Sequence, residues 1–125
     1  MADKDLSALA DEFIDHYNNG RVDEAIALCT EDLVITHSNR GVRIEGREAF
    51  REVLMTFAKL LPDKHFENRT YKHVVGDHVI YEHTWTGTAT EDIPGFGAKG
   101  ETIRLDLATR LTFHDGLIAD YHDYG

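Results

Sequence analysis

The sequence contains one cysteine, Cys29, and this scarcity already excludes two kinds of architecture. A single cysteine cannot form a disulfide within the chain or build a cysteine-based zinc site. Basic residues are also scarce: 13 Lys and Arg stand against 23 Asp and Glu, for a net charge of −10 with histidine neutral. Nucleic acids and anionic membrane surfaces are bound by basic protein faces, so we expect no nucleic acid and no membrane as a partner.

Long apolar runs are absent too. None approaches the roughly 20 residues that span a bilayer, and the first five residues, Met-Ala-Asp-Lys-Asp, are polar where a signal peptide would be apolar. We therefore expect a cytoplasmic protein. No dinucleotide-binding glycine motif follows a strand, and the His-x-His or Glu-x-x-His spacing of metal ligands does not occur, so we expect no cofactor and no metal site.

What is present predicts one folded domain over residues 1–125, with helices in its first half and strands in its second. Apolar residues recur at three- and four-residue steps from Leu6 to Tyr17, which indicates an amphipathic helix. Further helices are expected over 23–29 and 46–61, and strands over 33–37, 66–75, 78–88, 102–113 and 117–124. Because short turns join most of the late strands, we predict an α+β fold with a mainly antiparallel sheet.

Several short motifs occur in an order that is more specific than any one of them. Examples are Thr-Glu-Asp-Leu-Val-Ile-Thr-His at 30–37, Gly-Arg-Glu-Ala-Phe at 46–50 and Phe-His-Asp-Gly-Leu-Ile-Ala-Asp-Tyr-His-Asp-Tyr at 113–124. With them the chain resembles, over nearly its whole length, the SnoaL-like proteins of the NTF2-like superfamily. The resemblance implies a cone, in which a curved sheet wraps around three helices and encloses an apolar pocket. It also implies a homodimer formed through the outer face of the sheet.

Strand alternation indicates which side chains face this pocket. The inward set on 78–88 includes His83 and Trp85, and on 33–37 it includes Ile35 and His37. Hydropathy does not choose a face for the last strand, but the resemblance extends to limonene-type epoxide hydrolases, which point the matching Asp inward. The expected catalytic residues are therefore His83, Asp123 and His37. The expected substrate-binding residues are Tyr17, at the pocket rim, and Ile35, Trp85, Thr109 and Tyr121.

A carboxylate beside an imidazole has a direct chemical interpretation. Asp123 would fix the tautomer of His83 and favour its charged form, which would give an acid or base that titrates near neutral pH. The chain has eight histidines. Apart from His37 and His83, we expect all of them to be surface residues. An inward histidine is also commonly a hydrogen-bonded core residue, so a purely structural role for His83 stays open.

For each activity known among the resembled proteins, this chain lacks residues that the activity requires. The acidic donors of ketosteroid isomerases correspond to Phe13 and Thr109, and the base corresponds to a position at or near His37. The Arg-x-Asp segment of the epoxide hydrolases corresponds to 83–85, which reads His-Thr-Trp. The acid/base Asp of SnoaL-type cyclases also corresponds to Thr109. No single named activity is therefore implied intact.

Two hypotheses remain. The first is an acid/base enzyme of the isomerase, cyclase or hydratase/hydrolase type, which acts on a small, mostly apolar oxygenated molecule through the His-Asp pair. The second is a non-catalytic ligand-binding or dimerisation module whose polar pocket residues only satisfy one another. We favour the first. The glycine-rich segment 94–100 joins two strands and is either a lid on the pocket or a plain connection.

Overall fold

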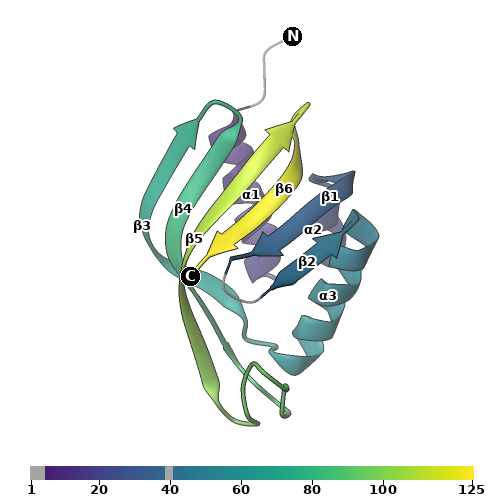
Figure 1. The fold of residues 1–125 in the computed structure, drawn as a ribbon, viewed down its shortest axis with the longest axis vertical. Coiled ribbons are helices and arrows are strands. Elements are labelled where there is room, and N and C mark those ends of the chain that lie inside the picture. Colours follow the sequence, from purple (N-terminus) through teal and green to yellow (C-terminus); the bar gives the residue numbers. More distant parts are fainter. Residues whose placement is uncertain (1–4, 39–40) are drawn as a thin grey trace.

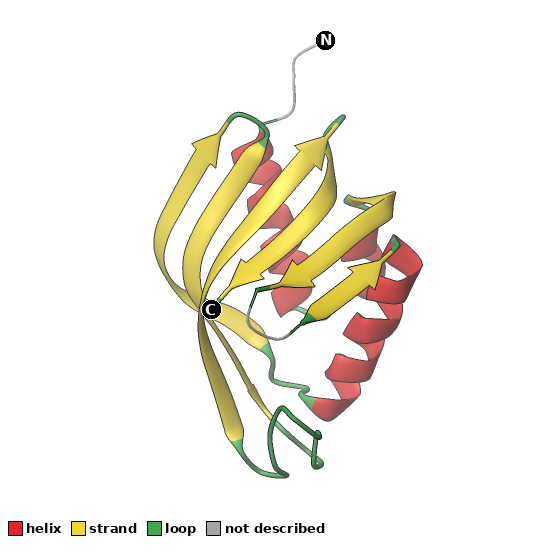
Figure 2. Ribbon diagram, viewed as in Figure 1, coloured by secondary structure: helices red, strands yellow, loops and turns green. Residues whose placement is uncertain are grey.

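The computed structural model describes residues 5–38 and 41–125, which form an α+β fold with helices packed on one curved sheet (Figure 2). The helices are α1 (Leu6–Asn18), α2 (Val22–Ile26) and α3 (Arg47–Leu60). The strands are β1 (Cys29–His37), β2 (Val42–Glu45), β3 (His65–Val75), β4 (His78–Thr88), β5 (Thr102–His114) and β6 (Leu117–Tyr124). Their order in the sheet is β2-β1-β6-β5-β4-β3, and β1 with β6 is the parallel pair among antiparallel neighbours. The predicted fold class is confirmed.

The sheet curves around α1, while α3 lies along the β1–β2 side of the molecule (Figure 1). The carboxylate of Asp5 accepts a 2.9 Å hydrogen bond from the backbone N–H of Ser7 and so caps the first turn of α1. The buried side of this helix carries Leu9, Ala10, Phe13, Ile14 and Tyr17, as its apolar periodicity predicts. The helix thus brings Tyr17, in its last turn, against the inner face of the sheet.

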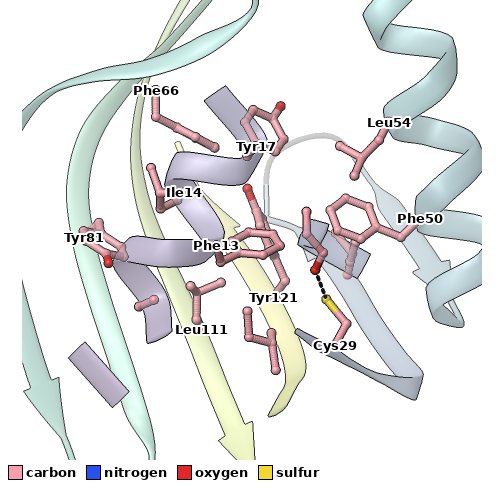
Figure 3. Packing of buried hydrophobic residues seen from close by; sticks show 14 of the residues in the cluster. Phe13, Ile14, Tyr17, Cys29, Phe50, Leu54, Phe66, Tyr81, Leu111 and Tyr121 are labelled. Atoms are coloured by element: carbon pink, nitrogen blue, oxygen red, sulfur yellow. Dashed lines mark hydrogen bonds between the residues drawn. The ribbon is translucent and has the colours of Figure 1, made fainter. Parts of the chain in front are cut away.

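Aromatic side chains from different elements meet in the core (Figure 3). The ring of Phe13 lies 6.2 Å from that of Phe50 on α3 and 6.0 Å from that of Tyr121 on β6, measured between centroids. These contacts join helix, helix and sheet. They fill the interior around the middle of α1, and the pocket described below lies beyond them, at the end of α1 marked by Tyr17.

The structure corrects two boundaries of the first half. The second helix ends at Ile26 and not at residue 29, and Cys29 is already the first residue of β1. The Cys29 thiol is buried and donates to the backbone carbonyl of Ala25 over 3.6 Å (Figure 3). Burial raises the pKa of this thiol to about 12, so it stays protonated and unreactive near neutral pH.

Two strand features were also missed. Strand β2 was not predicted, because Val-Arg-Ile-Glu is only four residues long and its pattern becomes informative only once it pairs with β1. On β6, strict alternation predicts that Ile118 and Tyr121 point to opposite faces, yet both side chains are buried. The register shifts at this point, with Thr112 opposite Asp120 but Phe113 opposite Ile118, and this bulge returns Ile118 to the inner face.

Over the described residues, no helix combines the length and the hydropathy that crossing a membrane would require.

Candidate functional site

A pocket of about 220 Å³ lies between the last turn of α1, α3 and the inner face of the sheet. Most of its wall is aliphatic and aromatic. Polar side chains come from Tyr17 on α1, His37 on β1 and Tyr121 and Asp123 on β6. A small apolar space with a few convergent polar groups is typical of a binding site for a small molecule.

Asp123 is held at this wall by its neighbours in the sheet. It lies opposite Thr109 on β5 and opposite His37 on β1, so β6 places it between the two. The fully buried Thr109 hydroxyl donates a 2.6 Å hydrogen bond to one carboxylate oxygen. Burial raises the pKa of Asp123 to about 6, while the hydrogen bond from Thr109 opposes that rise. A carboxylate with this pKa is a suitable proton acceptor near neutral pH.

His83 does not contact Asp123 directly in the way the sequence suggested, because Thr109 lies between them. The His83 Nε2 atom is 2.8 Å from the Thr109 hydroxyl oxygen. A hydroxyl has one hydrogen to donate, and Thr109 gives it to Asp123, so Nε2 of His83 is the donor in this contact. The three side chains thus form a hydrogen-bonded series in which His83 donates to Thr109 and Thr109 donates to Asp123.

The expectation that His83 is charged is wrong. Burial lowers its pKa to about 4, and the positive charge of Arg69 acts in the same direction. The imidazole stacks between the rings of Phe66, at 4.3 Å and 13°, and Tyr81, at 5.5 Å and 8°. These flat contacts explain the desolvation, and they leave a neutral imidazole that supports Thr109.

His83 also faces a groove of about 400 Å³ that is separate from the pocket. Strand β3 pairs Glu67 with Thr84 and Tyr71 with Glu82, so residues 68–70 bulge opposite His83 and the ladder opens there. Neither His83 nor Thr109 is among the described residues that line the pocket. Both side chains therefore lie behind Asp123 as seen from the pocket.

Tyr17 is buried in the pocket wall, not at the rim, with 8% of its surface exposed. The indole Nε1–H of Trp85 donates a 2.8 Å hydrogen bond to the Tyr17 hydroxyl. The Lys64 ammonium lies 3.9 Å from the centroid of the Tyr17 ring. Burial raises the pKa of Tyr17 and lowers that of Lys64. The phenol thus stays protonated beside a nearby ammonium.

Lys64 was not identified from the sequence. It is 7% exposed, although lysine is rarely buried, and it lies in the short connection between α3 and β3. A lysine in a connecting segment looks like a surface residue, and its cation–π contact with Tyr17 requires the folded chain. No local pattern marks it.

The remaining predicted residues line the pocket. Ile35 and Tyr121 face each other across the β1–β6 pair, and His37 and Asp123 do so two residues further along. Trp85 also lines the wall, through its ring. The structure therefore brings together six of the eight predicted residues at the pocket and places the other two behind it.

The glycine-rich connection supplies a further wall residue, Phe96. Its ring centroid lies 5.7 Å from that of Trp85 and 5.9 Å from that of Phe57. Backbone hydrogen bonds between Ile93 and Gly97 hold the turn that presents it. The glycine-rich sequence alone is compatible with a lid or a plain connection. The signal for a role in the pocket is the single aromatic residue among the glycines, since Phe96 lines the wall.

Within residues 5–38 and 41–125, no group of three or more His, Cys, Asp or Glu side chains is arranged to hold a metal ion.

Comparison with known proteins gives a family and a fold. A profile of the SnoaL-like domain matches residues 10–121. No curated protein sequence matches the chain. A proposed polyketide cyclase of Pseudomonas putida KT2440 superposes with a TM-score of 0.83 at 22% identity, covering 98% of this chain and 92% of that one.

Two further solved structures agree. A proposed polyketide cyclase of Xanthomonas campestris pv. campestris has a TM-score of 0.82 at 23% identity and covers 96% of this chain and 89% of its own. An NTF2-like protein of unknown function from Burkholderia pseudomallei has a TM-score of 0.78 at 12% identity, with 97% and 90% covered. At such identities the likeness shows a common fold.

Proposed function

The chain belongs to the SnoaL-like domain family, and we propose that it is a small-molecule enzyme of the cyclase or isomerase type in which Asp123 removes a proton from carbon. One observation carries the proposal: a carboxylate with a pKa of about 6 lies on the wall of a mostly apolar pocket and is oriented by Thr109. General bases work best when their pKa is close to the pH at which they operate.

The substrate that suits this pocket is small, neutral and mostly apolar, with a carbonyl group. A volume of about 220 Å³ corresponds to roughly seven water molecules, which is the size of a single ring with short substituents. We expect a neutral substrate because a charged group would lose its hydration against the aliphatic and aromatic wall.

The reaction begins when a carboxylate oxygen of Asp123 accepts a proton from the carbon next to the carbonyl. The electrons of that C–H bond form an enolate, whose negative charge lies on the carbonyl oxygen. Return of the proton to a different carbon completes an isomerisation. Attack of the enolate carbon on a second carbonyl instead closes a ring and leaves an alkoxide, which takes the proton back from Asp123. His37, the β1 partner of Asp123, is placed to transfer a second proton.

Thr109 and His83 serve this base without touching the substrate. Thr109 donates to one carboxylate oxygen of Asp123, and His83 donates to the Thr109 oxygen, which keeps the Thr109 hydroxyl hydrogen directed at Asp123. This is a positioning role. It replaces the catalytic role that the sequence suggested for His83, and the substrate-binding role suggested for Thr109.

Hydration or hydrolysis is less well supported. A water-activating relay needs polar partners beside Asp123 at the positions of His83 and Trp85. The Trp85 N–H instead donates to Tyr17, and His83 donates to Thr109.

Incubating the protein in D2O with a panel of one-ring ketones and 1,3-dicarbonyl compounds tests the proposal. We expect deuterium to enter at the carbon next to the carbonyl of at least one compound faster than in buffer alone. Binding without exchange across the panel would instead support the non-catalytic alternative, which is favoured by the fact that Asp123 and Tyr17 already have partners within the protein.

We also propose a homodimer through the outer face of the sheet. Tyr71 and Val75 on β3 and Tyr124 on β6 are each about half exposed, and their register positions place them on the face that points away from the helices. Exposed apolar groups on one face favour association. Light scattering should give twice the chain mass for the wild type and the chain mass for Tyr71→Glu; a monomeric wild type would contradict this.

A further inference from the structure

We propose that Tyr17 is the hydrogen-bond donor to the substrate carbonyl oxygen and that Trp85 and Lys64 prepare it for this role. The inference rests on the proposed proton abstraction by Asp123, which leaves negative charge on that oxygen. It assigns Tyr17 as a catalytic residue, and Trp85 and Lys64 as positioning residues. It also narrows the substrate class to carbonyl compounds that form an enolate.

The hydrogen bond from Trp85 determines where the Tyr17 hydrogen points. An indole N–H can only donate, so the Tyr17 oxygen accepts in the 2.8 Å contact. The phenolic hydrogen must then point away from Trp85. The Tyr17 ring is fixed against Phe66, with centroids 4.8 Å apart, and Tyr17 lines the pocket. A fixed O–H donor is therefore presented at the pocket wall.

Lys64 strengthens this donor. Its ammonium lies 3.9 Å from the Tyr17 ring centroid and is almost fully buried. A cation over an aromatic face is attracted by the ring's electrons, and it draws electron density from the phenol oxygen. The O–H becomes a better donor while the ring stays protonated. The same positive charge favours an oxyanion that forms beside Tyr17, because solvent screening is weak at a buried site.

The charges of the pocket balance during the reaction. Before proton transfer, the negative charge is on Asp123, and it is close enough to Tyr17 to raise the pKa of the phenol. After transfer Asp123 is neutral and the charge is on the substrate oxygen. Lys64 remains positive throughout, so one negative charge moves across the pocket without a change in the total. Tyr121 on β6 and His37 on β1 face the same space.

Binding of 4-nitrophenol tests the assignment without any turnover. Its anion is a one-ring oxyanion with a visible absorption band, so the ionised fraction of the bound probe is measured directly. The measurement uses the Asp123→Asn protein, in which no carboxylate competes for the positive charge. Nitrobenzene, which has no acidic hydroxyl, serves as the neutral probe of the same size.

We expect Tyr17→Phe in this background to weaken binding of the anion by about 10-fold or more, since a hydrogen bond to a charged group is lost. Lys64→Met should weaken it by about 3- to 10-fold and raise the pKa of the bound phenol. Trp85→Phe should have a smaller effect, because the Tyr17 hydrogen is then free to turn. Nitrobenzene binding should change less than 2-fold in Tyr17→Phe and in Lys64→Met.

An exposed lysine gives a matched control for Lys64: Lys59→Met on α3 should not alter binding. Equal losses of anionic and neutral probe in Lys64→Met would show a merely structural lysine and overturn its assignment. Unchanged anion binding in Tyr17→Phe, or no saturable binding by the Asp123→Asn protein, would overturn the whole inference. If Tyr17→Phe does not fold, the phenol pKa in Lys64→Met decides the outcome. Failure of carbon-acid exchange with intact anion binding would reject the proposed function alone.

Discussion

The Thr109 hydroxyl donates a 2.6 Å hydrogen bond to the carboxylate of Asp123, its register partner on the adjacent strand. This contact fixes a carboxylate that burial makes unusually basic, and it depends on nothing more than the pairing of β5 with β6. It also links Asp123 to His83, which donates to the same hydroxyl. The base of the proposed reaction is thus positioned by the sheet itself.

Replacing Thr109 by valine, which has nearly the same shape, should raise the pKa of Asp123 above about 6, because the donor that favours the ionised form is lost. We also expect the free energy of unfolding to fall by about 1–3 kcal/mol, since His83 loses its acceptor. Titration of the Asp123 carboxyl carbon by NMR measures the first effect. Thr102→Val, at an exposed position of the same strand, is the control, and an unchanged pKa in Thr109→Val would contradict the role given to this hydroxyl.

Asp123→Asn should stabilise the fold at neutral pH. The folded-state pKa of Asp123 lies above the value of 3.8 in an unfolded chain, so the native state binds the proton more tightly. Ionisation then costs stability as pH rises from about 4 to about 6, by at most ~3 kcal/mol for a shift of about two units. The difference in unfolding free energy between Asp123→Asn and the wild type should therefore grow over that interval and stay constant above it. Urea denaturation at pH 4, 5, 6 and 7 measures it; a pH-independent difference would mean that Asp123 is not buried.

His83 should remain neutral down to about pH 5. Its pKa is lowered to about 4 by burial between Phe66 and Tyr81. The imidazole C–H resonance of His83 should therefore change little between pH 8 and 5. A His83 midpoint at or above pH 6.5 would restore the charged imidazole that the sequence suggested.

Phe96→Ala should enlarge the pocket and weaken binding of one-ring probes. The ring packs against Trp85 and Phe57, so its removal opens one wall and costs contact area worth about 1–2 kcal/mol, or roughly 5- to 30-fold in affinity. Isothermal titration with nitrobenzene measures this. Phe96→Leu should retain most of the affinity, and equal binding by wild type and Phe96→Ala would place the ligand elsewhere.

Much of the fold could be predicted because its patterns are local. The periodicity from Leu6 to Tyr17 predicts α1, and alternation on β4 predicts that His83 and Trp85 face inward, as both do. Strand β2 was missed because four residues are too few for a period to be recognised. The burial of Ile118 was missed because a bulge changes the alternation.

The candidate site was harder to predict, since its key contacts join distant segments. Thr109 bridges His83 and Asp123 only through the register of β4, β5 and β6, and a single sequence does not state that register. The neutral state of His83 depends on the stacking rings around it. Lys64 shows the same limit: its contact with Tyr17 crosses from a loop to a helix that lies far away in the sequence.

The rate of hydrogen–deuterium exchange at the carbon next to the carbonyl of a one-ring ketone or 1,3-dicarbonyl compound, compared between the wild type and Asp123→Asn at pH 7, tests the central claim most directly. We expect the wild type to accelerate exchange, with a rate that falls below an apparent pKa of about 6. Asp123→Asn should lose at least 100-fold of that acceleration, since removal of a general base typically costs 10²–10⁴. The account would be contradicted by exchange of equal rate in both proteins, or by a wild-type rate that does not fall in acid.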